Sequence, residues 1–401
     1  MVSGPLRDRH ATARGSRAMK NAASIDPDVK GVVADGFEGL VPAFREGLDD
    51  ITAGGAALSL YHQGSEVVSL WAGVADPRTG RAWTDDTPSV LFSVSKGLTA
   101  LVVALLAQDG RIDIDAPVAD AWPEFGCHGK SRLTLGDVLA HRAGLSAPRS
   151  DLSLEDVLDH DRWAADIAAQ EPLWTPGAGH SYHALTFGPI VQEVIRRVTG
   201  LELQQHFQEL IARPLAADAT LKAAADVLDR AAFLTETEGY RSAATAEIEH
   251  WAERAQTLGG AFRRIRADGF NDRRVRAAGL AASGGVGTAA ALARIWSSVV
   301  VETGGVRLLE DDSITRLCRP RSEGPTVFSP QQPYQRWGAG VLLCSEAAPW
   351  FTPESFGHGG VGGQAGIADP GLKVGLGYVR SRLDVHDPVP GIIRQIRQIL
   401  S

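Results

Sequence analysis

Five apolar side chains share one helical face near the beginning of the chain. They are Phe37, Leu40, Val41, Phe44 and Leu48. Their spacing predicts an amphipathic helix within residues 34–50. Two β-rich apolar runs, 55–61 and 66–74, flank the turn-like residues 62–65 and predict a β-hairpin.

The middle of the chain has mostly helical periodicity, interrupted by glycine and proline. Its candidate helices cover residues 98–107, 135–141, 153–169, 185–199 and 203–211. The stretch 223–275 is rich in alanine, arginine and glutamate and receives no assigned element. Its aromatic residues Trp251, Phe262 and Phe270 are candidates for covering a pocket or for packing within the core.

Strand-like and glycine-rich segments return after residue 275. The pattern predicts strands at 337–343, 366–368 and 373–379, and helices at 288–301 and 389–400. If both ends of the chain contribute to one sheet, the helical block is an insertion. A functional site is then expected at the seam.

Composition narrows the class of protein. The chain has 401 residues, of which 44% are hydrophobic and 22% charged, as in a globular protein rather than a disordered one. Three widely spaced cysteines, Cys127, Cys318 and Cys344, do not make a disulfide scaffold. The formal charge of −8 and the absence of a long basic stripe argue against nucleic acid as a partner.

Membrane and export segments are not expected either. The longest strongly apolar run, residues 98–107, is too short to span about 30 Å of hydrocarbon. Basic residues occur within residues 1–20, but no apolar segment follows them as in a secretory signal. We expect residues 1–26 to be a mobile tail and the protein to be cytoplasmic; its oligomeric state is left open.

The first candidate for chemistry is the pair Ser93 and Lys96, just before the apolar run. Residues three apart share a helical face, so the amine can reach the hydroxyl. A serine hydroxyl needs a neighbour to take its proton, and a lysine can do so only as the neutral amine. The apolar surroundings favour that form by lowering the pKa. The chain has six lysines against 34 arginines, so a lysine here is notable.

Two further segments carry weaker signals. Tyr182 follows a Pro/Gly-rich approach to a helix, and a nearby charged lysine would lower its pKa and make it a base or proton shuttle. Residues 356–363 contain His358 and five glycines, so exposed backbone N–H groups there could bind an oxyanion. These glycines do not indicate a dinucleotide-binding motif, because no βαβ unit surrounds them.

Other motifs are set aside. Residues 179–183 and 281–285 each miss G-x-S-x-G by one glycine and follow no convincing strand. The histidines show no zinc-ligand spacing, and His180 and His183 lack a third ligand. No metal or organic cofactor is expected.

Together, the Ser-x-x-Lys, the later tyrosine and the C-terminal glycine-rich triplet resemble the serine β-lactamase and penicillin-binding-protein superfamily. The resemblance spans about residues 35–385 and is nearest to the class C-like branch that includes family VIII carboxylesterases. It is supported by residues 109–118, 133–145, 174–188, 284–288 and 375–379. It implies an α+β fold, with an antiparallel sheet flanked by helices and an inserted, mostly helical domain. We assign residues 27–85 and 276–401 to the sheet domain and 86–275 to the helical one.

The resemblance also implies the site. Ser93 is the acylated nucleophile, and Lys96 and Tyr182 form the base system. The backbone N–H groups of Ser93 and Val361 form the oxyanion hole. The triplet that precedes the second donor is His358, Gly359 and Gly360.

Two departures bear on the substrate. Antibiotic-hydrolysing members have Tyr-x-Asn, and here Ala184 replaces the asparagine and donates no hydrogen bond. They commonly have Lys-Thr-Gly, and here His358 replaces the lysine, with an uncertain charge near pH 7. An ester needs neither group, so we expect a carboxylesterase acting on a small ester. The alternatives are a β-lactamase, a D-peptidase or amidase, an acyltransferase using the same site, and a non-catalytic penicillin-binding sensor.

Overall fold

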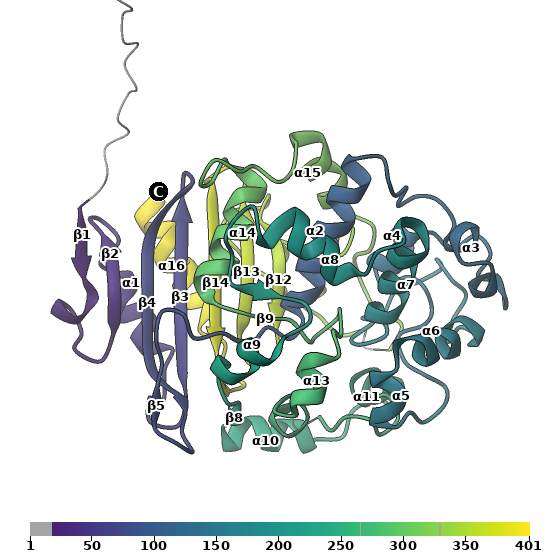
Figure 1. Cartoon of the computed structure of the whole chain (residues 1–401), viewed down its shortest axis with the longest axis horizontal. Helices are drawn as coiled ribbons and strands as arrows, with labels where there is room; N and C mark the ends of the chain where they lie inside the picture. Colours follow the sequence, from purple (N-terminus) through teal and green to yellow (C-terminus); the bar gives the residue numbers. More distant parts are fainter. Residues whose placement is uncertain (1–17, 265, 329) are drawn as a thin grey trace, which may run out of the picture.

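One antiparallel sheet organises the protein and is built from both ends of the chain (Figure 1). The computed structural model describes residues 18–264, 266–328 and 330–401. The strand order is β1-β2-β4-β3-β14-β13-β12-β11-β10, with β5 paired to β4. The bounds are β1 Met19–Asn21, β2 Lys30–Ala34, β3 Gly55–His62, β4 Ser65–Asp76, β5 Arg81–Ala82, β10 Arg336–Trp337, β11 Leu342–Leu343, β12 Phe356–Gly360, β13 Gln364–Asp369 and β14 Val374–Arg380.

The two ends of the chain meet where β3 pairs with β14, from His62 opposite Val374 to Ala56 opposite Arg380. Side chains alternate along β14 and thereby separate the two faces of the sheet. Gly375 and Gly377 leave room for the backbone of α14 (Ala289–Val300).

The intervening apolar residues of β14, Leu376 and Tyr378, belong to the core on the opposite face. That core contains α1 (Leu40–Glu46) and α16 (Val389–Leu400). Helices therefore cover both faces of the sheet.

Most of the remaining helices come from the middle of the chain (Figure 1). They are α2 Val94–Gln108, α3 Val118–Ala121, α4 Leu135–Leu139, α5 Leu154–Leu158, α6 His160–Ala169, α7 Phe187–Thr199, α8 Leu203–Phe207, α9 Ala225–Arg230, α10 Glu238–Thr245, α11 His250–Thr257, α12 Arg266–Phe270 and α13 Arg273–Ala277, with α15 Asp311–Cys318 after them. Two small sheets join distant segments: β6 (Ser89–Val90), β9 (Val286–Gly287) and β7 (Ala219–Thr220), and β15 (Arg382–Leu383) with β8 (Thr235–Glu236).

The α+β fold class and the hairpin of β3 and β4 are confirmed. Two element predictions are corrected, and so is the prediction of the N-terminal tail. Residues 337–343 are not one strand but the two short antiparallel strands β10 and β11, because the chain turns between them at positions that include Gly338 and Gly340. The helix expected over 153–169 is two helices, because the Asp159 side chain caps a new start at α6. The stretch 223–275, for which no element was predicted, contains β8, the helices α9 to α12 and the start of α13.

The third correction concerns the expected tail over residues 1–26. Residues 1–17 lie outside the described residues. Met19–Asn21 pair with β2, and Ala22 is buried, so the later part of the predicted tail is held in the sheet. The division into two domains remains a prediction. In the described ranges, no helix is both long and apolar enough to cross a membrane.

Candidate active site

Ser93 is the N-cap residue of α2, at the end of a backbone turn. The residue before it, Phe92, has a φ of 46°, which is uncommon for a side chain of this size. Backbone hydrogen bonding holds the turn in place, because the N–H of Leu91 donates to the carbonyl of Gly285 at 2.8 Å. Ser93 remains partly exposed while Phe92 and Val94 are buried, so the turn presents the hydroxyl at the surface of the core.

Lys96 lies one helical turn further along α2 and is fully buried. Its Nζ is 3.2 Å from Oγ of Ser93, 2.7 Å from the carbonyl oxygen of Ala184 and 2.9 Å from that of Ala282. Burial holds the pKa of Lys96 well below its ordinary value, and the charge of Arg266 lowers it further. The predicted contact between Lys96 and Ser93 is therefore present, with the amine in surroundings that favour its neutral form.

The two carbonyl oxygens define the direction of the amine. A carbonyl only accepts hydrogen bonds, and a neutral amine has two N–H donors and one lone pair. If the N–H groups donate to Ala184 and Ala282, the lone pair is left for the third neighbour. That neighbour is the Ser93 hydroxyl, which can donate its proton. This arrangement would allow Lys96 to act as a general base toward the Ser93 hydroxyl.

Tyr182 converges on the same point from the loop before α7. The Lys96 Nζ lies 4.8 Å from the centre of its ring. The expectation of a lowered pKa for Tyr182 is wrong: burial raises it above the ordinary value, and hydrogen bonding with Ser93 offsets only part of the rise. The phenol consequently remains protonated near neutral pH, as a proton donor requires.

Two histidines hold the loop that carries Tyr182. His141 accepts a hydrogen bond at Nδ1 from the N–H of His183, and its carbonyl accepts one from the N–H of Ser181 at 3.1 Å. The His141 ring also packs edge-on against the Tyr182 ring, with centroids 4.7 Å apart. The His183 ring is fixed in turn by the N–H of Leu145 and the carbonyl of Ser181.

Strand β12 brings the glycine-rich triplet to α2. Gly97 of α2 allows this approach, since a Cβ there would lie 3.1 Å from that of His358 and 2.8 Å from the ring of Trp296. A Cβ on Gly360 would lie 2.6 Å from the carbonyl oxygen of Leu91, two residues before Ser93. The turn after β12, which begins with Val361, is therefore placed beside the Ser93 segment.

The backbone N–H groups of Ser93 and Val361 donate to no other described residue. His358 is buried, and burial lowers its pKa to about 3, so its side chain is neutral near pH 7. His358 therefore offers no positive charge to a substrate near pH 7. Ala184 contributes its carbonyl to Lys96 and has no side-chain donor. Gly359 lies between His358 and Gly360 on β12 and accepts a hydrogen bond from Nδ1 of His358.

Two residues beside the site were not anticipated from sequence. Trp337 stacks on Tyr182, with ring centroids 5.4 Å apart and planes at 19°. Arg266 is buried and acts electrostatically on Lys96. Both are far from Ser93 and Lys96 in the chain, and neither lies in a motif.

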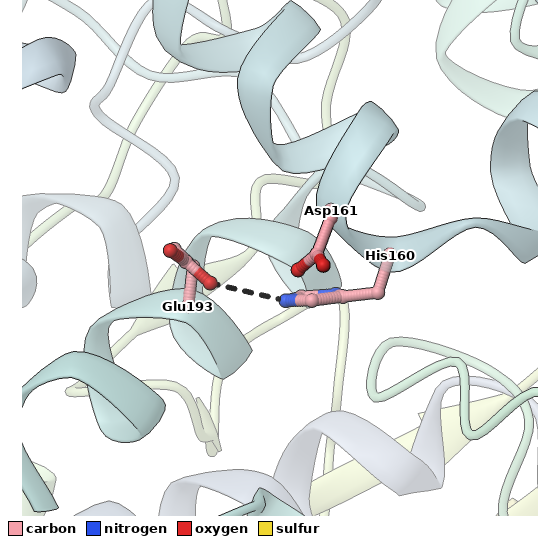
Figure 2. Close-up of side chains that lie close together, drawn as sticks. All are labelled: His160, Asp161 and Glu193. Carbon is pink, nitrogen blue, oxygen red and sulfur yellow. Dashed lines mark hydrogen bonds and ion pairs between the residues drawn. The ribbon is translucent and has the colours of Figure 1, made fainter. Parts of the chain in front are cut away.

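A second polar cluster lies away from this site, between α6 and α7 (Figure 2). It contains His160, Asp161 and Glu193, with Nε2 of His160 3.3 Å from an oxygen of Glu193. Both oxygens of Glu193 already accept hydrogen bonds from the guanidinium groups of Arg196 and Arg197. A metal ion would have to displace these cations, so the cluster is best described as an ion-pair network.

Comparisons with known proteins identify the family and the fold. The family model described as Beta-lactamase matches residues 40–401. The chain is 33% identical over 380 residues to "Esterase/beta-lactamase LipL" of Mycobacterium tuberculosis (strain ATCC 25618 / H37Rv), covering 90% of this chain and 86% of that protein.

Solved structures are similar over the same extent. A family VIII carboxylesterase superposes with a TM-score of 0.82 at 31% identity, covering 92% of this chain and 99% of its own. EstA from Arthrobacter nitroguajacolicus Rue61a superposes with a TM-score of 0.83 at 30% identity, covering 92% of this chain and 97% of its own. The resemblance inferred from sequence is thereby confirmed.

Proposed function

The chain belongs to the beta-lactamase family, and on that premise we propose that it is a carboxylesterase that forms an acyl-enzyme at Ser93. The observation that carries the proposal is the position of the Lys96 amine. The amine is buried, hydrogen-bonded to two carbonyl oxygens and in contact with the Ser93 hydroxyl. The similar proteins named as esterases or carboxylesterases support the choice of substrate class.

In the first step, Lys96 takes the Ser93 proton as Oγ attacks the ester carbonyl carbon. The backbone N–H groups of Ser93 and Val361 bind the oxyanion of the tetrahedral intermediate. Donors of this type each lower the barrier by about 3 kcal/mol. Collapse of the intermediate breaks the bond to the alcohol oxygen and leaves the acyl group on Ser93.

Proton transfer completes the first half-reaction. Tyr182 is protonated near neutral pH, so its phenol donates a proton to the departing alkoxide and takes one from the Lys96 ammonium. Water then attacks the acyl-enzyme, with Lys96 and Tyr182 acting in the reverse sense. The two half-reactions consume one water and release one acid and one alcohol.

The site lacks two side chains that would recognise a β-lactam substrate. Ala184 has no amide to hold the acyl side chain, and the neutral His358 offers no cation to a carboxylate. An ester substrate does not depend on either. We therefore rank ester hydrolysis above lactam hydrolysis.

The test combines turnover with labelling. Purified protein is offered p-nitrophenyl butyrate and a chromogenic cephalosporin, and the site of fluorophosphonate addition is located by mass spectrometry. We expect ester turnover, a single adduct at Ser93, and loss of both in Ser93→Ala. Turnover retained in Ser93→Ala would overturn the assignment of the nucleophile, and a stable adduct without turnover would indicate a non-catalytic sensor.

A further inference from the structure

Arg266 acts electrostatically on Lys96, one of the proposed catalytic groups. It is the first residue of α12, and the residue is 7% exposed. Phe270 of the same helix contacts Phe92, the neighbour of Ser93, with ring centroids 4.9 Å apart. Ala267 belongs to the apolar cluster that also contains Val361. Residues four apart share a helical face, so Arg266 lies on the face of α12 that meets the Ser93 segment through Phe270.

Among the residues that the structure describes, the guanidinium of Arg266 has few polar partners. Its Nη1 donates to the carbonyl of Arg263 at 3.1 Å, and no carboxylate of the described residues forms an ion pair with it. The acidic residue whose charge acts on it, Glu236, accepts a hydrogen bond from the N–H of Ala267 and pairs with Arg241 at 3.5 Å.

A guanidinium has five N–H donors in a planar fork that matches a carboxylate. A buried cation without a counter-ion is unfavourable, and an anion that binds beside it removes that cost. We propose that Arg266 binds an anionic group of the substrate, so that the enzyme prefers esters that carry a carboxylate on their acyl or alcohol part. This inference rests on the proposed esterase function at Ser93.

The experiment measures kcat/KM for matched pairs of esters. For the acyl part, the pair is mono-p-nitrophenyl adipate and p-nitrophenyl hexanoate, whose chains have equal length. The adipate is long enough that its free carboxylate does not rapidly cleave its own ester. For the alcohol part, the pair is 4-carboxyphenyl butyrate and phenyl butyrate. The preference is the ratio of kcat/KM for the anionic ester to that for the neutral one.

In at least one pair we expect a preference of about tenfold or more for the anionic ester, because charge-assisted hydrogen bonds are stronger than hydrogen bonds between neutral groups. Arg266→Gln should reduce that ratio by about tenfold, mainly through KM, and Arg266→Lys should keep part of it. Arg263→Gln is the matched control, because its side chain is 80% exposed and Arg266 contacts only its carbonyl. It should leave the ratio unchanged.

The outcomes separate the two proposals. If the wild-type protein cleaves none of the four esters, the proposed function fails. If it cleaves them without an anionic preference, or if Arg266→Gln leaves the preference intact, the inference about Arg266 alone is overturned. Fluorophosphonate labelling of Arg266→Gln at Ser93 shows that the variant has folded with its nucleophile in place.

Discussion

His141 accepts a hydrogen bond at Nδ1 from the backbone N–H of His183, 3.2 Å away. Because His183 follows Tyr182 directly, this bond sets the position of the proposed proton donor. Burial holds the pKa of His141 well below its ordinary value, so the ring stays neutral and Nδ1 stays an acceptor. His141 is therefore a positioning residue for Tyr182.

Removing that acceptor should slow the chemical step more than it weakens binding. We expect His141→Leu to lower kcat by about ten- to a hundredfold with a small change in KM, because a misplaced catalytic group is costly. His141→Asn, whose amide oxygen can accept the same bond, should recover part of the loss. The exposed His250 supplies a control, His250→Ala. Equal loss in the leucine and asparagine variants would argue against a role through Nδ1.

Lys96 should set the acid limb of the pH–rate profile. A base works only when deprotonated, so activity is lost as pH falls through the pKa of Lys96 and is retained above it. Because that pKa is depressed, activity should already be present near neutral pH. Lys96→Arg keeps a positive charge that cannot be deprotonated and should lower kcat by about 10²- to 10⁴-fold. Turnover that appears only above about pH 10 in the wild type would contradict a depressed pKa.

The same depressed pKa has a consequence for stability. Between the pKa of folded Lys96 and about 10.4 in the unfolded chain, the unfolded state binds one more proton than the folded state. Stability attributable to this group therefore rises with pH by about 1.4 kcal/mol per unit in that window. Unfolding in urea at several pH values should show that the free energy of unfolding of the wild type rises relative to that of Lys96→Met between pH 7 and 10. A pH-independent difference would indicate an amine that stays charged.

Gly360 tests the placement of the turn that begins with Val361. An added Cβ would lie 2.6 Å from the carbonyl oxygen of Leu91, so Gly360→Ala must push β12 away from the Ser93 segment. We expect kcat to fall by about ten- to a hundredfold through loss of oxyanion binding. At Gly359 an added Cβ meets nothing nearer than 3.9 Å, so Gly359→Ala is a matched control on the same strand. Similar kinetics for the two variants would remove the argument for Val361.

Glu193 should contribute to stability rather than to catalysis. Its buried carboxylate is bonded to Arg196 and Arg197, which are partly exposed. Allowing for that exposure, Glu193→Ala should lower the free energy of unfolding by about 1–3 kcal/mol. The exposed Glu124, which pairs with Arg197, gives a control that should change little. Loss of ester turnover on treatment with a chelator would instead favour a functional metal at the Glu193 cluster.

The contact between Ser93 and Lys96 could be predicted from sequence because it is local: the two residues are one helical turn apart. The α2 helix and the β3–β4 hairpin followed from periodicity for the same reason. Residues 337–343 were misassigned because their alternation resembles one strand, while the chain folds back through Gly338 and Gly340.

The contributions of Arg266, Trp337 and His141 could not be predicted, because each reaches the site through contacts between residues far apart in sequence. The rise in the pKa of Tyr182 depends on how completely the ring is buried, which no local pattern reports. The sequence therefore predicts which groups react, and that assignment remains a prediction. It does not predict the packing that sets the protonation of those groups.

The pairing of β3 with β14 also bears on biosynthesis. Some 300 residues separate His62 from its partner Val374, so a nascent chain leaves the ribosome with β3 unpaired on that edge until β14 has been made. The hairpin that carries Val361 emerges just as late. A ribosome-bound intermediate thus already contains Ser93, Lys96 and Tyr182 but not Val361, and ester turnover should begin only after the segment that carries Val361 has been made.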